Sequence, residues 1–201
     1  MVNKSSTPEF YDAIFREKPH KWENIHRDYL AFSILSQWVR EPTTMLDYGC
    51  GNGHTIALFH SQWPDTFYTG VDISTVALDL ARKRNTIPTT AWYTQMPSMA
   101  YLWDVITIMG VAEHFANPVQ DLKDIAARLN GFMYLEIPNC LAYSKKPEEG
   151  FRTADGGIGQ MEWHLKRETW EKMLAEAGLR IMKGYKGPTP YWEFIWILKR
   201  E

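Results

Sequence analysis

Residues 45–53 read Met-Leu-Asp-Tyr-Gly-Cys-Gly-Asn-Gly, and they decide the fold class of this 201-residue chain. Residues 43–48 form a short, largely apolar run that predicts a buried strand, the glycines predict a turn, and residues 56–59 are apolar at helical spacing. Glycines at such a turn let the backbone approach a ligand closely at the N-terminus of a helix. We therefore expect a ligand site at this strand, turn and helix.

An acidic residue ends each of the first two predicted strands. Asp47 stands two positions before Gly49, and the turn has the spacing G-x-G-x-G rather than the dinucleotide pattern G-x-G-x-x-G. Asp72 ends the strand predicted over 67–73, 25 positions after Asp47, where a carboxylate accepts hydrogen bonds from ribose hydroxyls. Together the two features predict a nucleoside cofactor.

Strands and helices alternate along most of the chain. Further strands are predicted over 103–109, 132–137, 179–185 and 191–198, and helices are predicted to begin at Ser74 and at Asn117-Pro118 and to end at Gly178. Such alternation predicts an α/β fold, with a mostly parallel sheet, helices on both faces and a ligand crevice at the carboxyl ends of the strands.

The length favours a single domain with one core. We expect an N-terminal helical cap over 1–42, a cofactor-binding core over 43–138, a substrate lid or loop over 139–163, and a C-terminal helix and hairpin over 164–201. The predicted face of the cap helix carries Ile25, Tyr29, Phe32, Ser36 and Val39. Residues 139–163 show no periodicity, which is typical of a lid or binding loop.

The composition of the chain limits the kinds of partner that we expect it to bind. The chain has 22 Lys+Arg and 24 Asp+Glu, so no excess of positive charge draws it to nucleic acid. Its two cysteines, Cys50 and Cys140, favour a reducing compartment, and we interpret both as small buried residues rather than reactive thiols. The one long uncharged stretch, 85–103, is too polar and too interrupted by proline to span a membrane. We expect a cytoplasmic protein with no membrane span and no bound metal.

Several segments carry a resemblance to a known family. They are residues 45–53, 70–74 and 103–115, and His164-Leu165 ahead of the helix that ends at 176–179. In these segments the chain resembles the class I S-adenosylmethionine-dependent methyltransferases, in their small-molecule branch with the ubiquinone-type enzymes. The resemblance implies a Rossmann-like fold with a seven-stranded, mostly parallel sheet, an antiparallel last strand beside the sixth, and helices on both faces. It also implies S-adenosylmethionine as cofactor and S-adenosylhomocysteine as product.

The resemblance further implies which residues hold the cofactor. The glycines of the turn would form its backbone floor, Asp72 would bind the ribose, and Arg27 would hold the carboxylate. Gln95 stands near the position where relatives carry an Asp that receives the adenine amino group. The expected cofactor-binding residues all follow strand ends, apart from one arginine of the cap: Asp47, Gly49, Cys50, Gly51, Gly53, Asp72, Ile73, Gln95, Met96, Met109, Gly110 and Arg27.

Glu113, His114 and His164 are the candidates for acid–base catalysis. A hydroxyl acceptor needs a base, because a neutral alcohol is a poor nucleophile, and histidine titrates near neutral pH. The expected substrate contacts come from the cap and from the 139–163 loop: Tyr11, Phe15, Trp22, Asn139, Tyr143 and Trp163. We expect methyl transfer to an O or N atom of a small-molecule acceptor, by in-line displacement in a pocket that these two segments roof.

Other functions stay open at this stage. An RNA or nucleotide methyltransferase would carry an Asn-Pro-Pro or Asp-Pro-Pro segment after the fourth strand, where this chain has residues 110–113, Gly-Val-Ala-Glu. A non-catalytic cofactor-binding partner protein is the second alternative, because the Asp after the third strand is absent. A nicotinamide oxidoreductase shares the acidic residue at strand two but needs the longer glycine spacing. The sequence assigns no oligomeric state.

Overall fold

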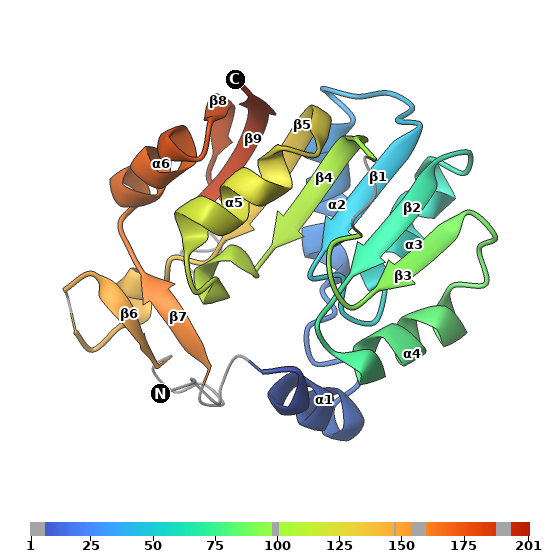
Figure 1. The fold of residues 1–201 in the computed structure, drawn as a ribbon, viewed down its shortest axis with the longest axis horizontal. Helices are drawn as coiled ribbons and strands as arrows, with labels where there is room; N and C mark the ends of the chain where they lie inside the picture. Colours follow the sequence, from blue (N-terminus) through green and yellow to red (C-terminus); the bar gives the residue numbers. More distant parts are fainter. Residues whose placement is uncertain (1–6, 98–100, 147, 154–159, 188–193) are drawn as a thin grey trace. The chain divides into compact units, whose positions relative to one another are not determined.

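The computed structural model describes residues 7–97, 101–146, 148–153, 160–187 and 194–201. Within these ranges the chain divides into two compact units, residues 7–107 and residues 108–201. Strands of both units belong to a seven-stranded sheet with the order β3-β2-β1-β4-β5-β9-β8, and a separate two-stranded sheet pairs β6 with β7 (Figure 1). The predicted seven-stranded α/β fold is confirmed.

The helices of this structure are α1 (Pro8–Glu17), α2 (Ile25–Leu35), α3 (His54–Gln62), α4 (Thr75–Arg84), α5 (Pro118–Ala126) and α6 (Arg167–Glu176), with short 3-10 helices η2 (Ala112–His114) and η3 (Cys140–Tyr143). The strands are β1 (Thr44–Tyr48), β2 (Phe67–Val71), β3 (Thr90–Tyr93), β4 (Trp103–Met109), β5 (Leu129–Ile137), β6 (Gly150–Thr153), β7 (Met161–His164), β8 (Leu179–Tyr185) and β9 (Phe194–Arg200).

Parallel pairing organises the unit of residues 7–107. β1 lies between β2 and β4 in the sheet order, and β1 pairs with β2 so that Asp47 is opposite Gly70. The buried centre of β1 consists of Met45, Leu46 and Asp47, as expected for a strand that helices cover on both faces, and its one acidic residue is therefore buried. Ser74 caps α4 as predicted, since its hydroxyl accepts from the Ala77 backbone N–H. Asp72, at the end of β2, is held beside the start of α4, because its carboxylate accepts from the Ser74 backbone N–H.

The N-terminal segment differs from the prediction. It forms two helices, α1 and α2, and Asn24 caps α2 through its side chain. The side chains of Ile25 and Tyr29 are about half exposed, whereas α2 buries Asp28, Ala31, Ile34 and Leu35. None of the five predicted positions is buried, so the predicted inward face was wrong: the buried side of α2 is offset from it and includes a polar side chain, Asp28.

Antiparallel pairing organises the unit of residues 108–201. β9 pairs with β5 from Met133 opposite Leu198 to Ile137 opposite Phe194, and β8 pairs with the other edge of β9. The insertion of the last strand beside the sixth is confirmed. α6 packs against β8, with Trp170 wholly buried, and ends at Gly178, whose φ of 75° favours glycine at that position (Figure 1).

Two boundaries in this unit differ from the prediction. β5 begins at Leu129, which the helical periodicity assigned to the preceding helix, and α5 ends at Ala126. The described part of β9 begins at Phe194, and residues 191–193 of the predicted strand lie outside the described ranges. Helix and strand periods overlap at such junctions, so periodicity alone does not place the boundary.

The segment 139–163 has more regular structure than its sequence predicted. η3 follows β5, and β6 and β7 form an antiparallel ribbon with Phe151 opposite Trp163. These two rings pack at 5.0 Å between centroids, and such a cross-strand aromatic pair stabilises a short ribbon. Residues 154–159 between the strands lie outside the described ranges. Among the described residues, no helix has the length and apolar character needed to cross a membrane.

Candidate cofactor and acid–base site

The glycine turn after β1 has a backbone that needs glycine. Gly49, Gly51 and Gly53 all have positive φ, at 80°, 52° and 73°. A Cβ on Gly53 would lie 2.4 Å from Nδ2 of Asn85 and 2.7 Å from the ring of Trp92, so no side chain fits there. The turn is also held to β2, because the backbone N–H groups of Gly49 and Cys50 donate to the Val71 carbonyl.

Asp72 joins the glycine turn to the start of α4. Its Oδ2 accepts from the Gly51 backbone N–H at 2.8 Å, and its Oδ1 accepts from the Ser74 backbone N–H at 2.9 Å. Burial raises the pKa of Asp72 to about 6, although these two hydrogen bonds act to lower the pKa. A carboxylate fixed in this way is oriented to accept further hydrogen bonds from ribose hydroxyls.

Asp47 is a buried carboxyl group with one unmatched oxygen. Its Oδ1 accepts from the Thr107 hydroxyl at 2.7 Å, and its Oδ2 has no hydrogen-bond partner among the described residues. Burial is the main cause that raises the pKa of Asp47 to about 7. A buried acidic oxygen without a partner fits a cationic ligand group, and S-adenosylmethionine carries an ammonium and a sulfonium.

Arg27 lies beside these acidic groups, on α2. Its Nε is 3.9 Å from Oδ1 of Asp28, which is 1% exposed and accepts hydrogen bonds from His54 and from the Thr55 hydroxyl. Burial raises the pKa of Asp28, while Arg27 and His54 lower it. The arginine thus stands in a cluster of charged groups next to the glycine turn. Sequence reasoning missed Asp28 and His54, although a charged residue at a core position of α2 was the available signal.

The predicted aromatic residues of the cap come together at the glycine turn. The rings of Phe15 and Trp22 lie 5.0 Å apart and those of Tyr11 and Trp22 lie 6.1 Å apart, between centroids. Phe15 covers Gly51, because its Cζ is 3.4 Å from the position that a Cβ would take. Asn52 holds the loop between α1 and α2, because its Nδ2 donates to the Pro19 carbonyl and to Oε1 of Glu23.

The remaining expected cofactor residues have varied surroundings. Ile73 and Gln95 are exposed and Met96 is half-buried, as suits residues that meet a ligand. Cys50 is 6% exposed, and burial raises the pKa of its thiol, which agrees with a small buried residue. Met109 is buried and Gly110 has a φ of 66°, with its N–H donated to the Glu136 carbonyl.

His114 has a defined tautomer. Its Nδ1 lies 2.7 Å from the carbonyl oxygen of Met161, which only accepts, so Nδ1 carries the proton and Nε2 has the lone pair. Burial lowers the pKa of His114, and the Met161 carbonyl and Glu162 raise it. Oε1 of Glu113, itself buried, is 3.6 Å from Nε2. His114 is therefore a neutral imidazole at pH 7, with the nitrogen that takes a proton next to a carboxyl group.

His164 is further from solvent than His114. The residue is 0% exposed, and its Nε2 lies 3.3 Å from Oε1 of Glu162, which is also buried. Cys140 on η3 donates a hydrogen bond to Glu162 as well. Sequence reasoning missed Glu162, and it assigned Cys140 no part in the site. The alternation of β7 is the signal for Glu162, since Glu162 and His164 are the two fully buried positions of that strand.

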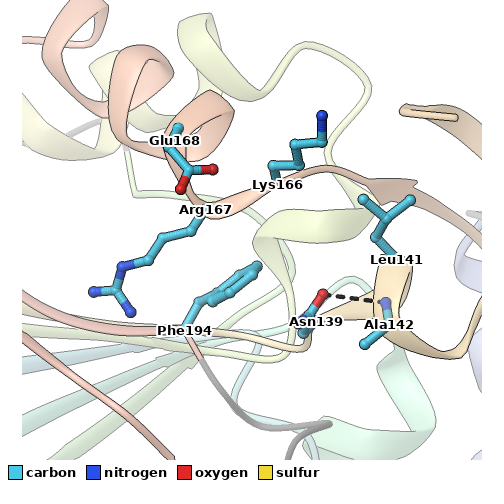
Figure 2. Close-up of a pocket in the computed structure, with 7 residues that line it drawn as sticks. All are labelled: Asn139, Leu141, Ala142, Lys166, Arg167, Glu168 and Phe194. Carbon is cyan, nitrogen blue, oxygen red and sulfur yellow. Dashed lines mark hydrogen bonds between the residues drawn. The ribbon is translucent and has the colours of Figure 1, made fainter. Parts of the chain in front are cut away.

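The expected substrate residues of the 139–163 segment have different structural surroundings. Asn139 caps η3 and lines a cavity of about 260 Å³ between the start of α6 and the start of β9 (Figure 2). Trp163 donates its Nε1–H to the Phe115 carbonyl at 2.9 Å. Tyr143 belongs to η3, and its side chain lies outside the described part of the chain. The residues that line the cavity are Asn139, Leu141, Ala142, Lys166, Arg167, Glu168 and Phe194.

Comparison with known proteins agrees with this geometry. A curated relative, the malonyl-[acyl-carrier protein] O-methyltransferase of Anoxybacillus flavithermus, is 23% identical over 136 residues, which are 65% of this chain and 52% of that protein. The chain thus spans about half the length of this relative.

Two solved structures share the fold. The 1,6-didemethyltoxoflavin-N1-methyltransferase of Burkholderia thailandensis, with bound S-adenosylhomocysteine, has a TM-score of 0.74 at 16% identity and covers 96% of this chain and 86% of its own. The sugar N-methyltransferase of a Streptoalloteichus species has a TM-score of 0.72 at 15% identity and covers 95% and 93%. A family described as a methyltransferase domain matches residues 21–183, most of the chain. The chain therefore belongs to the class I S-adenosylmethionine-dependent methyltransferase family.

Proposed function

We propose that this protein transfers a methyl group from S-adenosylmethionine to an oxygen or nitrogen atom of a small-molecule acceptor. The observation that carries the proposal is the tautomer of His114, whose protonated Nδ1 is held by the Met161 carbonyl and whose Nε2 is left as a base. A buried base of this kind serves a neutral hydroxyl acceptor, which must lose its proton as it attacks.

In this proposal the cofactor is held by residues of the glycine turn and of the strand ends. Asp72 binds the ribose hydroxyls, Asp47 and Arg27 match the charged groups of the methionyl part, and the glycine backbone forms the floor. Ile73, Gln95 and Met96 contact the base, and Met109 with Gly110 contact the methionyl part from the end of β4. S-adenosylmethionine, when bound, supplies a methyl group that its sulfonium has activated.

The protein's own contribution is to orient the acceptor, exclude water and move one proton. His114 Nε2 takes the acceptor proton as the acceptor attacks, and Glu113 stabilises the resulting imidazolium through its neighbouring carboxyl group. His164 is wholly buried, so we assign it a supporting role behind His114. Tyr11, Phe15, Trp22, Asn139, Tyr143 and Trp163 stay the proposed acceptor contacts, within a single methyltransferase domain.

Cofactor binding is the first test. Isothermal titration with S-adenosylmethionine and S-adenosylhomocysteine is expected to show binding to the wild type and a loss of at least about 100-fold for Asp72→Ala, because the ribose loses its acceptor. Asp79→Ala is the matched control, since Asp79 is an exposed residue of α4 paired with Arg82. No binding by the wild type would overturn the proposal.

Turnover is the second test. With hydroxyl acceptors, His114→Asn is expected to lower kcat by about 10²- to 10⁴-fold, the usual contribution of a general base. Activity should fall on the acid side only below the ordinary histidine pKa of 6.5, because burial lowers the pKa of His114 and the base must be neutral. His26→Asn, at an exposed position of α2, is the control. Full turnover in His114→Asn would remove the base from the mechanism, and binding without turnover on any acceptor would favour a non-catalytic partner protein.

A further inference from the structure

Glu162 is a buried carboxyl group that the proposed mechanism does not yet use. It lies on β7 and is 7% exposed. Its Oε1 is 3.3 Å from Nε2 of His164, and the Cys140 thiol donates to the same carboxyl group. Three side chains from β7 and η3 therefore meet in one buried polar cluster, which we call the Glu162 cluster: Glu162, His164 and Cys140.

Cys140 is a hydrogen-bond donor to Glu162 in this cluster. Burial, with Glu113 and Glu162 nearby, raises the pKa of the Cys140 thiol, so Cys140 remains an S–H donor at neutral pH. Nε2 of His164 lies 3.3 Å from Oε1 of Glu162, close enough for an electrostatic interaction. Hydrogen bonds to a carboxylate stabilise its charged form against the cost of burial. The Cys140 thiol therefore offsets part of the cost of burying a carboxylate at Glu162.

The backbone of β7 links this charge to His114. Met161, the residue before Glu162, accepts the Nδ1–H of His114 at 2.7 Å. η2, which carries His114, packs directly against β7. The ring of His114 is thus oriented by the same short strand that carries the buried carboxylate. The Glu162 charge acts on His114 in the direction opposite to burial, which by itself disfavours the imidazolium.

We propose that Glu162 is a positioning residue for His114: held by Cys140 and His164, its carboxylate stabilises the imidazolium that forms when Nε2 of His114 takes a proton. The inference rests on the proposed function in so far as it needs His114 to act as a base. Glu162 does not touch the acceptor in this role. It sets how readily the neighbouring imidazole accepts a proton, as a buried carboxylate does behind a catalytic histidine.

Other titratable groups lie on η2 itself and on the elements around it. Glu113 is on η2 itself, with Oε1 at 3.6 Å from Nε2, and Cys140 and His164 belong to the Glu162 cluster. α5 packs against η2 and contributes Asp121, whose Oδ2 accepts from the Asn117 backbone N–H. Glu162 is distinguished among them because it accepts from Cys140, lies next to His164 and follows Met161, the residue that fixes the tautomer of His114.

The test is an NMR titration of the histidine ring nitrogens, which needs no substrate. In Glu162→Gln the pKa of His114 is expected to fall by about 1 or more, because an opposite charge nearby is lost while burial stays. Glu176→Gln, which removes the same charge from an exposed position at the end of α6, should leave the pKa of His114 unchanged. An unchanged titration of His114 in Glu162→Gln would overturn the inference.

Cys140 provides a second pair of variants in case Glu162→Gln does not fold. Cys140→Ala removes a donor to Glu162, which weakens the hold on the carboxylate and alters the His114 titration, whereas Cys140→Ser keeps a donor and is expected to stay near the wild-type value. Identical titrations in the two variants would contradict the proposed network.

The two proposals fail in different ways. If His114→Asn keeps full turnover while Glu162→Gln still lowers the pKa of His114, then the base is wrong and the electrostatic link stands. If His114→Asn loses turnover and Glu162→Gln leaves the titration unchanged, then the base stands and the link is wrong. With both correct, Glu162→Gln lowers kcat and moves the acid limb of the pH profile to lower pH, because a weaker base accepts the proton less readily.

Discussion

At the scale of single residues, the acidic groups next to the glycine turn are arranged for a ligand rather than for the stability of the ligand-free protein. Asp47 is buried with one oxygen unmatched, and burial raises its pKa to about 7. Asp72 is held by two backbone N–H groups and still has a raised pKa. Strained or poorly compensated groups are typical of functional sites, where the bound ligand completes them.

Asp47→Asn is expected to stabilise the ligand-free protein at pH 8 and to weaken cofactor binding. The pKa of Asp47 in the folded state, about 7, lies above the ordinary value of 3.8, so folding favours the protonated form. The stability that comes from protonated Asp47 is complete below pH 4 and is lost as the pH rises through 7. At pH 8 this loss amounts to about 4 kcal/mol. Urea unfolding at pH 5 and pH 8 should show a larger gain for the variant at pH 8.

The exposed residue Asp65 provides the control for this prediction. Asp65→Asn should leave the free energy of unfolding nearly unchanged at both pH values, since a surface substitution has little effect. A gain for Asp47→Asn that is equal at pH 5 and pH 8 would contradict the titration argument.

At the scale of secondary-structure elements, α1 is attached to the cofactor-binding residues through the start of α4. Asp12 on α1 accepts hydrogen bonds from the Ser74 hydroxyl at 2.6 Å and from the Val76 backbone N–H at 3.1 Å. An acidic side chain at a helix N-terminus also meets the positive end of the helix dipole. Because α1 carries Phe15, which covers Gly51, this attachment decides where the cap aromatic residues lie.

Asp12→Ala is expected to destabilise α1 more than the rest of the chain. The loss of hydrogen bonds to the start of α4 should cost about 1–2 kcal/mol, in the range of a lost helix cap. Amide hydrogen exchange should become faster over residues 8–17 and stay nearly unchanged over residues 25–35. Equal acceleration of both helices, or none in α1, would show that Asp12 does not anchor it, and Glu9→Ala, an exposed position of α1, is the control.

At the scale of the whole molecule, each unit carries its own functional residues: residues 7–107 carry the glycine turn, and residues 108–201 carry His114 and the Glu162 cluster. A ligand that binds only the folded state stabilises the whole chain through mass action. This stabilisation does not depend on which contacts the ligand makes, so the stabilisation reports cofactor binding independently of turnover.

S-adenosylhomocysteine is expected to raise the Tm of the wild type by about 5–10 °C at a concentration of about 100 times its Kd. This follows from a stabilisation of about 2.7 kcal/mol at that concentration and from the size of the chain. Asp72→Ala should show almost no increase at the same concentration, and Asp79→Ala should behave as the wild type. Equal increases in Asp72→Ala and wild type would show that Asp72 does not hold the ligand.

Much of the fold was predictable because its signals are local. The apolar run before the glycines specified β1, Ser74 specified the start of α4, and Gly178 specified the end of α6. Each signal acts within a few residues, through hydrophobic burial, a side-chain cap or a positive φ. The order of these signals along the chain was enough to predict an α/β fold with a mostly parallel sheet, whereas the seven strands and the antiparallel last strand were implied by the resemblance to the methyltransferases.

The rest depended on contacts between residues far apart in sequence. No local pattern places Glu162 beside Cys140 or Met161 beside His114, and none predicts that Asp28 on α2 accepts from His54. The β6–β7 ribbon also formed where the sequence showed no period.

The sequence by itself therefore determined the elements and the identity of the glycine turn, because caps, turns and burial patterns are properties of neighbouring residues. Only the tertiary structure decided which nitrogen of His114 carries the proton and which carboxyl groups stay unmatched, because hydrogen-bond partners and desolvation depend on how distant segments pack.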